Sequence, residues 1–286
     1  MSRSPSASSA TPDRFTTLAG SGNQRGVSHP RDDERGQLLG LPSTVRGGLF
    51  DLDGVLTRTA SVHAAAWSEM FDAFLRERAD REGEPVQPFL PADYDRYVDG
   101  RPRLDGTRSF LRSRGIDLPE GSPTDPAGAP TVNGLSNQKN DLVLRLLDKR
   151  GVEVFEGSVR YVRAARAAGL RTAVVSSSAN TAQVLEAAGI ADLFEARIDG
   201  VVAAERGLAG KPAPDTFLAG AAALGLAAPD AAVFEDALAG VEAGRAGGFG
   251  YVVGVDRVGQ SAELLRHGAD VVVDDLSDLF GEAGEP

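Results

Sequence analysis

The sequence predicts an α/β protein in which a doubly wound, Rossmann-like parallel sheet is interrupted by an inserted helical domain. After about residue 155, short apolar runs that suit strands alternate with helical segments, a pattern typical of parallel sheets. Before that point the pattern is helical for about 90 residues, and this helical block directly follows one short buried strand. The expected organisation is a core domain at 45–59 and 152–286, with an α-helical cap domain at 60–151.

Residues 1–44 are expected to form a disordered tail. They are rich in Ser, Gly, Arg, Asp and Thr and hold almost no apolar cluster to bury. The apolar region of a secretory signal is missing. A basic Ser/Arg targeting peptide fits less well, since acidic residues interrupt the stretch at Asp13, Asp32, Asp33 and Glu34.

The first half of the chain contains one expected strand, 48–52, which the turn Asp53-Gly54 ends. Residues 60–80 are expected to form a long helix. Further helices are expected at 91–98, 104–114 and 137–149. Residues 117–134 are rich in Pro and Gly and are expected to form a loop.

The second half alternates between helices and strands. The expected helices lie at 158–168, 180–188, 214–224, 238–246 and 261–266. The expected strands lie at 171–176, 195–199, 231–235, 250–255 and 270–273. In such a sheet the ligand site lies at the carboxyl ends of the strands, so an insertion at that edge would cover the site as a lid.

Composition narrows the function classes. The net charge of −11 and the pI near 4.8 argue against nucleic acid or an anionic membrane as a partner. No apolar run approaches the ~18 residues of a membrane span. The chain has no cysteine, which excludes disulfides and thiolate metal sites and fits the reducing cytoplasm, where we expect the protein to be.

Two carboxylates follow the first strand. Asp51 and Asp53 are two residues apart in extended chain, so both side chains can face one ligand, and Gly54 permits a sharp exit. The alternative is an Asp-Gly turn after a core strand.

The next two strand ends carry hydroxyls and a cation. Ser176, Ser177 and Asn180 open a helix, where hydroxyls and free N–H groups bind phosphate, although simple N-capping is the alternative. Lys211 precedes a proline and therefore lies in extended chain, from which its ammonium can reach the crevice. The alternative for Lys211 is a solvated loop.

A further strand ends in the acidic pair Glu235-Asp236. Ion pairs with nearby arginines are the alternative role for this pair. Together with Asp51 and Asp53, however, four carboxylates would meet in one crevice and repel each other unless a cation lies among them. Mg²⁺ suits oxygen ligands and phosphate chemistry.

These four motifs in this order resemble the haloacid dehalogenase superfamily, over about residues 46–275. The resemblance is strongest for the β-phosphoglucomutase-like branch, which has a helical cap after the first motif. Thr59, His63 and Trp67 support that branch, because residues four apart share one helix face. Core packing is the alternative for this stripe, above all for Trp67.

The resemblance implies a mechanism. Asp51 would be the nucleophile that forms an aspartyl phosphate, and Asp53 the general acid/base. Thr59 would lie at the cap hinge and His63 would help to position Asp53. Asp51, Asp236, the backbone carbonyl of Asp53 and nearby Glu235 would hold Mg²⁺. Ser176, the residue after it, and Lys211 would bind the phosphoryl oxygens, and Asn180 would contact substrate when the cap is closed.

The cap segment departs from the pattern of that branch. A Lys-Gly pair with an Arg three residues after the Gly is expected there for the distal phosphate, whereas this sequence reads Asp99-Gly100-Arg101-Pro102-Arg103. Gly100 and Arg103 match and Asp99 replaces the lysine. Either Arg101 supplies the missing cation or Asp99 contacts a sugar hydroxyl.

The predicted function is Mg²⁺-dependent phosphoryl transfer of the β-phosphoglucomutase type, from β-glucose 1-phosphate to glucose 6-phosphate. A sugar-phosphate phosphatase with the same nucleophile is the alternative. A non-catalytic phosphate-binding module is disfavoured because every motif keeps its polar residues, and a dehalogenase would not need Asp53 or the Glu235-Asp236 pair. The expected partners are a small phosphorylated sugar and a sugar bisphosphate, and the expected state is a monomer.

Overall fold

The computed structural model describes residues 36–83, 85 and 87–281. Six parallel strands form one sheet in the order β3-β2-β1-β4-β5-β6, so the first strand lies near the middle. The strands are β1 (Gly47–Phe50), β2 (Arg171–Val175), β3 (Ala196–Ile198), β4 (Ala231–Glu235), β5 (Tyr251–Val255) and β6 (Val271–Val273). The apolar residues of β1, β2 and β4 are buried on both faces, as expected for a parallel sheet with helices on each side, whereas the edge strand β6 is partly exposed.

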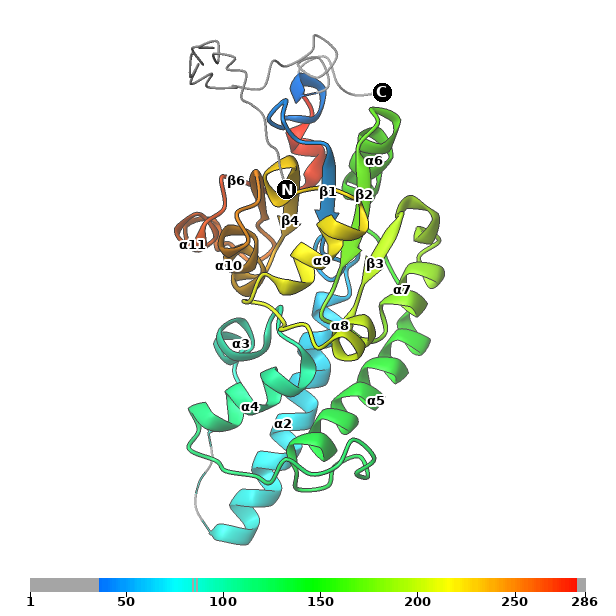
Figure 1. Ribbon diagram of the computed structural model, residues 1–286. Helices are drawn as coiled ribbons and strands as arrows, with labels where there is room; N and C mark the ends of the chain where they lie inside the picture. The colour runs from blue at the N-terminus through cyan, green and yellow to red at the C-terminus, as the bar shows by residue number, and fades with distance from the viewer. Residues whose placement is uncertain (1–35, 84, 86, 282–286) are drawn as a thin grey trace, which may run out of the picture.

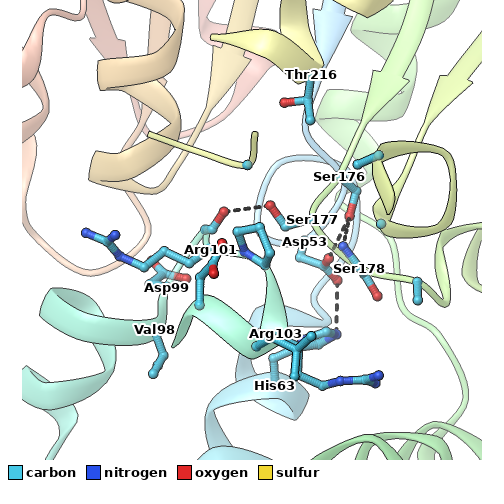
Figure 2. A pocket seen from close by; sticks show the side chains of 18 of the residues that line it. Asp53, His63, Val98, Asp99, Arg101, Arg103, Ser176, Ser177, Ser178 and Thr216 are labelled. Atoms are coloured by element: carbon cyan, nitrogen blue, oxygen red, sulfur yellow. Dashed lines mark hydrogen bonds and ion pairs between the residues drawn. The ribbon is translucent and has the colours of Figure 1, made fainter. Parts of the chain in front are cut away.

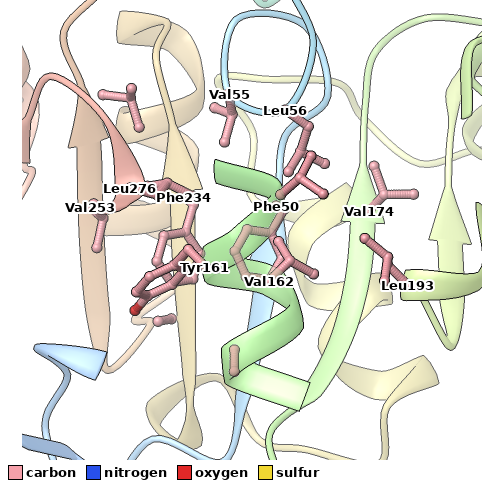
Figure 3. Packing of buried hydrophobic residues seen from close by; sticks show 14 of the residues in the cluster. Phe50, Val55, Leu56, Tyr161, Val162, Val174, Leu193, Phe234, Val253 and Leu276 are labelled. Atoms are coloured by element: carbon pink, nitrogen blue, oxygen red, sulfur yellow. The ribbon is translucent and has the colours of Figure 1, made fainter. Parts of the chain in front are cut away.

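Helices cover both faces of the sheet (Figure 1). They are α6 (Glu156–Ala167), α7 (Thr181–Ala187), α8 (Gly200–Arg206), α9 (Asp215–Ala223), α10 (Leu238–Ala246) and α11 (Ser261–His267), with short η2 (Ala191–Leu193), η3 (Ala228–Asp230) and η4 (Leu276–Leu279). On one face, Tyr161 and Val162 of α6 pack over Phe50 of β1 and Phe234 of β4 (Figure 3). The rings of Phe50 and Phe234 stack with centroids 4.3 Å apart. A second apolar cluster joins the opposite face to α9, α10 and α11.

The chain between β1 and α6 forms a helical insertion that lies beyond the carboxyl ends of the strands (Figure 1). Its elements are α2 (Ala60–Glu82), α3 (Pro91–Asp93), the π-helical turn η1 (Tyr94–Val98), α4 (Arg103–Ser113) and α5 (Val132–Arg150). It has its own apolar cluster, in which the rings of Trp67, Phe71, Phe89 and Phe110 are in contact. The predicted α/β fold with an inserted helical segment is therefore confirmed.

Three local predictions need correction. Helix α5 begins at Val132 rather than 137, because the Thr131 hydroxyl caps it by accepting the Gly134 N–H at 2.9 Å. The expected helix at 91–98 is one α-helical turn followed by a π-helical turn. Helix α8 was not predicted; the Asp199 carboxylate caps it by accepting two backbone N–H groups.

The predicted C-terminal bound of the disordered tail, residue 44, is wrong. Residues 1–35 lie outside the described residues, but residues 36–39 are helical and Leu39 and Leu41 are buried in the sheet's apolar cluster. The Tyr161 hydroxyl donates to the Leu39 carbonyl at 2.7 Å. The segment 36–44 therefore belongs to the core domain, because its leucines bury apolar surface against α6.

Among the described residues, no helix combines the length and the apolar character that crossing a bilayer requires.

Candidate active site

A cavity of about 610 Å³ lies between the carboxyl ends of the strands and the helical insertion. Its lining combines side chains from both parts, and Figure 2 shows those near Asp53. All the residues predicted for the site line this cavity except Thr59, which contacts Asp53, and Lys211. Lys211 does not line the cavity directly but contacts Asp51, which does.

Asp51 directly follows β1 and is almost fully buried, at 6% exposure. The Lys211 ammonium donates to Asp51 Oδ1 at 2.5 Å and to Glu235 Oε1 at 2.6 Å. Burial raises the pKa of Asp51, while Lys211 acts in the opposite direction. Burial lowers the pKa of Lys211, but the charges of Asp51 and Glu235 outweigh burial and raise this pKa. Lys211 is therefore a charged, buried group and not part of a solvated loop.

Three buried carboxylates form a group that could hold a metal ion. Oxygen atoms of Asp51, Glu235 and Asp236 lie within 4.8 Å of one another. Burial, and next the charge of Glu235, raise the pKa of Asp236. A Cβ at Gly54 would lie 1.8 Å from the Asp236 carboxylate, and Gly54 has φ +96°, so only glycine suits this close approach. Of the four predicted carboxylates, Asp53 is not in this group.

The Asp53 carboxylate instead faces three other groups. The Thr59 hydroxyl donates to Asp53 Oδ1, and the Ser176 hydroxyl lies 3.4 Å from Asp53 Oδ2. His63 Nε2 lies 3.6 Å from Asp53 Oδ1. Thr59 is in turn 2.6 Å from the Thr57 hydroxyl. The three grouped carboxylates could therefore hold a cation, while the Asp53 carboxylate lies among two hydroxyls and an imidazole.

Lys139 of α5 is a site residue that the sequence analysis missed. It is buried, lines the cavity, and its ammonium lies 2.9 Å from His63 Nδ1 and 4.9 Å from the Trp67 ring centroid. Burial, and next the charge of Arg103, lower the pKa of Lys139 to about 7. Burial, and next the charge of Lys139, lower the pKa of His63 to about 4. His63 is therefore neutral at neutral pH and accepts from Lys139.

The sequence did carry a signal for Lys139. Buried residues recur along α5 with helical spacing at Leu135, Leu142 and Val143, and Lys139 lies on that same face. A lysine on an apolar stripe is costly to bury unless it has a role, which makes it a candidate site residue.

The hydroxyls and amide after β2 contact the insertion. The Ser177 hydroxyl donates to the Gly100 carbonyl at 2.7 Å, and the Asn180 amide donates to Asn140 Oδ1 at 3.1 Å. A Cβ at Gly100 would lie 2.9 Å from Ala237 Cβ. These contacts hold the insertion against the strand ends.

The cap segment places its two arginines differently. Arg103 lies beside His63, whereas the Arg101 side chain extends away from Asp53 (Figure 2). Arg103 Nε is buried without a hydrogen-bond partner in the structure. Asp99 and Tyr94 both line the cavity. Burial, and next the charge of Glu235, raise the pKa of Asp99 to about 7.

Comparisons with known proteins agree with this geometry. The family model for haloacid dehalogenase-like hydrolases matches residues 45–248. A β-phosphoglucomutase from Mycobacterium bovis is 59% identical over 250 residues, which cover 86% of this chain and 95% of that protein. A β-phosphoglucomutase from Bacillus subtilis is 31% identical over 231 residues, covering 81% and 90%.

The fold recurs in solved structures. The β-phosphoglucomutase from Clostridium difficile superposes with a TM-score of 0.63 at 24% identity, covering 84% of this chain and 95% of that one. The chain belongs to the haloacid dehalogenase-like hydrolase family and, within it, to the β-phosphoglucomutase-like branch that its motifs predicted.

Proposed function

We propose that the chain is a Mg²⁺-dependent phosphomutase that converts β-glucose 1-phosphate to glucose 6-phosphate through an aspartyl phosphate on Asp51. One observation carries the proposal: a single cavity has the nucleophile at its core side and the cations Arg103 and Lys139 at its insertion side. A sugar bisphosphate needs both ends of such a site.

Asp51 is placed to attack phosphorus. Its carboxylate oxygen forms the new P–O bond while the bond from phosphorus to the sugar oxygen breaks. Lys211 acts against the burial that raises the pKa of Asp51, and it presents positive charge where the phosphoryl oxygens would lie. Removal of the Asp51 nucleophile should therefore stop turnover, and Asp51→Asn is expected to retain less than about one per cent of wild-type activity.

Asp53 is placed to exchange the proton. It gives a proton to the departing sugar oxygen and takes one from the hydroxyl that later attacks the aspartyl phosphate. Thr59 donates to its Oδ1, near which His63 Nε2 also lies at 3.6 Å, and the Ser176 hydroxyl lies 3.4 Å from its Oδ2. Because His63 accepts from Lys139 of α5, the position of Asp53 depends on the insertion being in place.

The residues present fit a magnesium ion. Asp51, Glu235 and Asp236 offer converging carboxylate oxygens, the ligand type that Mg²⁺ prefers, and the raised pKa values of Asp51 and Asp236 are those of a site lacking its cation. Asp51 and Asp236, with the Asp53 backbone carbonyl and Glu235 alongside, would hold it. When bound, Mg²⁺ neutralises charge that otherwise keeps a carboxylate away from a phosphate.

The insertion supports the mutase reaction over hydrolysis. A phosphatase needs water at the aspartyl phosphate, whereas a mutase must keep water out until a sugar hydroxyl attacks. Ser177, Gly100, Asn180 and Asn140 join the two parts across the cavity mouth. The orphaned Arg103 Nε offers a donor for the distal phosphate.

A product assay tests the proposal. Purified protein with Mg²⁺, β-glucose 1-phosphate and a glucose bisphosphate primer is expected to form glucose 6-phosphate in large excess over free phosphate. Asp51→Asn serves as the matched control for contaminating activity. Free phosphate as the main product, without primer dependence, would contradict the mutase proposal and favour the sugar phosphatase.

A further inference from the structure

The loop between β5 and α11, taken together with the first residue of α11 as residues 256–261, lies outside the four strand-end motifs. Its own hydrogen bonds hold it in shape: Asp256 Oδ1 accepts the N–H groups of Val258, Gly259 and Gln260 at 3.1, 2.7 and 2.9 Å. The Asp256 N–H donates to the Val273 carbonyl at 2.8 Å, which ties the loop to β6. Two side chains of this loop, Arg257 and Gln260, contact the main chain of the strand-end motifs.

Arg257 binds the turn that carries Asp53. Its Nε donates to the carbonyl of Gly54 at 2.7 Å, and Nη1 donates to the carbonyl of Asp274 at 2.5 Å. Gly54 directly follows Asp53 and is packed against the Asp236 carboxylate. Arg257 therefore holds the carbonyl of Gly54, which follows Asp53 in the chain and packs against the Asp236 carboxylate.

The same guanidinium also lies on the second connection between core and insertion. Its carbon is 3.5 Å from the centroid of the Phe155 ring, over which Arg58 also lies at 4.3 Å. The Phe155 N–H donates to the Leu56 carbonyl at 2.9 Å, so the chain leaving the core and the chain returning to it are paired here. Arg257 contacts both connections.

Gln260 binds the fourth motif from the other side. Its Nε2 donates to the backbone carbonyl of Asp236 at 3.0 Å. One rigid loop thus holds the main chain on both sides of the crevice: Gly54 through Arg257 and Asp236 through Gln260.

We infer that the 256–261 loop is a positioning element, in which Arg257 and Gln260 set the spacing between the Asp53–Gly54 turn and Asp236. Its effect on metal binding rests on the proposed function, whereas its effect on the Asp53 turn does not. Partners that orient metal ligands typically change metal affinity by about 10–100-fold when they are removed.

Two variants test the inference. Arg257→Lys keeps the charge over Phe155 but replaces a planar fork that reaches two carbonyls with one point donor. Gln260→Met keeps the length of the side chain and removes the N–H donor. Val258→Ala is the matched control, because it lies in the same loop with a side chain 66% exposed.

Two measurements are needed, both on the full chain without substrate. Hydrogen exchange of the metal-free protein is followed at the hydrogen-bonded amides of Gly54, Leu56 and Thr57. Calorimetric titration with MgCl₂ gives the Mg²⁺ dissociation constant. Arg257→Lys is expected to speed exchange at these three amides, and Gln260→Met to weaken Mg²⁺ binding about tenfold, with melting temperatures close to that of Val258→Ala.

Other results would overturn the inference. Unchanged exchange in Arg257→Lys together with unchanged Mg²⁺ affinity in Gln260→Met would show that the loop positions nothing. Exchange that rises throughout the core, with a matching loss of melting temperature, would make Arg257 merely structural. If wild-type protein binds no Mg²⁺, the proposed function fails, and the exchange data alone decide the inference.

Discussion

Replacing Lys211 with methionine should strongly destabilise the protein. The ammonium is buried and lies 2.5 Å from Asp51 and 2.6 Å from Glu235, so the variant leaves two buried carboxylates without their cation. Loss of one partner from a buried ion pair costs about 3–5 kcal/mol. For a domain of this size that loss corresponds to a melting temperature lower by roughly 6–20 °C.

The loss should depend on pH. The pKa of Asp51 is already raised by burial and would rise further without Lys211. A carboxyl group whose pKa is higher in the folded than in the unfolded state binds more protons when folded, so its contribution to stability falls as the pH rises. The variant should therefore lose less stability at pH 5.5 than at pH 8.

Calorimetry in chelator-containing buffer measures both effects, with Lys149→Met as control, because Lys149 is exposed at the end of α5. Added Mg²⁺ should restore part of the lost stability by supplying positive charge to the same carboxylates. A melting temperature within 2 °C or so of wild type at pH 8, or the same loss at both pH values, would refute the assignment of Lys211 as the cation that offsets these carboxylates.

Three further predictions follow from the site and the core. Arg103→Ala removes a charge-assisted contact worth roughly 1.5–3 kcal/mol and should lower mutase flux about ten- to hundredfold while raising the share of phosphate lost to water; equal product ratios in variant and wild type would argue against a distal-phosphate role. The pKa of Lys139 is lowered to about 7, so Lys139 loses its charge above that pH and kcat/KM should decline on the alkaline side. In Lys139→Arg this decline should move to higher pH. Superimposable pH profiles of the variant and the wild type would exclude a role for the Lys139 charge. Deletion of residues 1–41 removes the buried Leu39 and Leu41, worth about 1.5–3 kcal/mol each, and should lower the melting temperature by at least about 6 °C; an unchanged melting curve would mean that the docked segment adds nothing.

The sequence alone was sufficient for the fold class and for most of the site. Strand and helix periodicity depends on local burial, and a parallel sheet brings the carboxyl ends of its strands to one edge, whatever the details of packing. Asp51, Ser176, Lys211 and Asp236 could therefore be assigned to one crevice although as many as 185 positions separate them along the chain (from 51 to 236). Gly54 was expected to permit a sharp exit from the strand, and its backbone is indeed left-handed, with φ +96°.

The family resemblance implied a separate role for Asp53, but only the tertiary structure shows which groups its carboxylate faces. Residue spacing placed Asp53 with the other three carboxylates, but strand β1 ends at Phe50, and the Asp53 side chain faces Thr59, His63 and Ser176. Which way a side chain points after a strand ends depends on the turn, and alternation no longer applies.

Local sequence patterns also could not predict the contacts between elements that lie far apart in the chain. Lys139 meets His63 across 76 positions, Arg257 meets Gly54 across 203, and Leu39 packs beneath Tyr161 across 122. Each of these depends on how two elements pack, which the periodicity of either element does not specify. The sequence thus determined which elements form and which chemistry meets at the strand ends, while packing of the insertion and the N-terminal segment decided how that chemistry is held and enclosed.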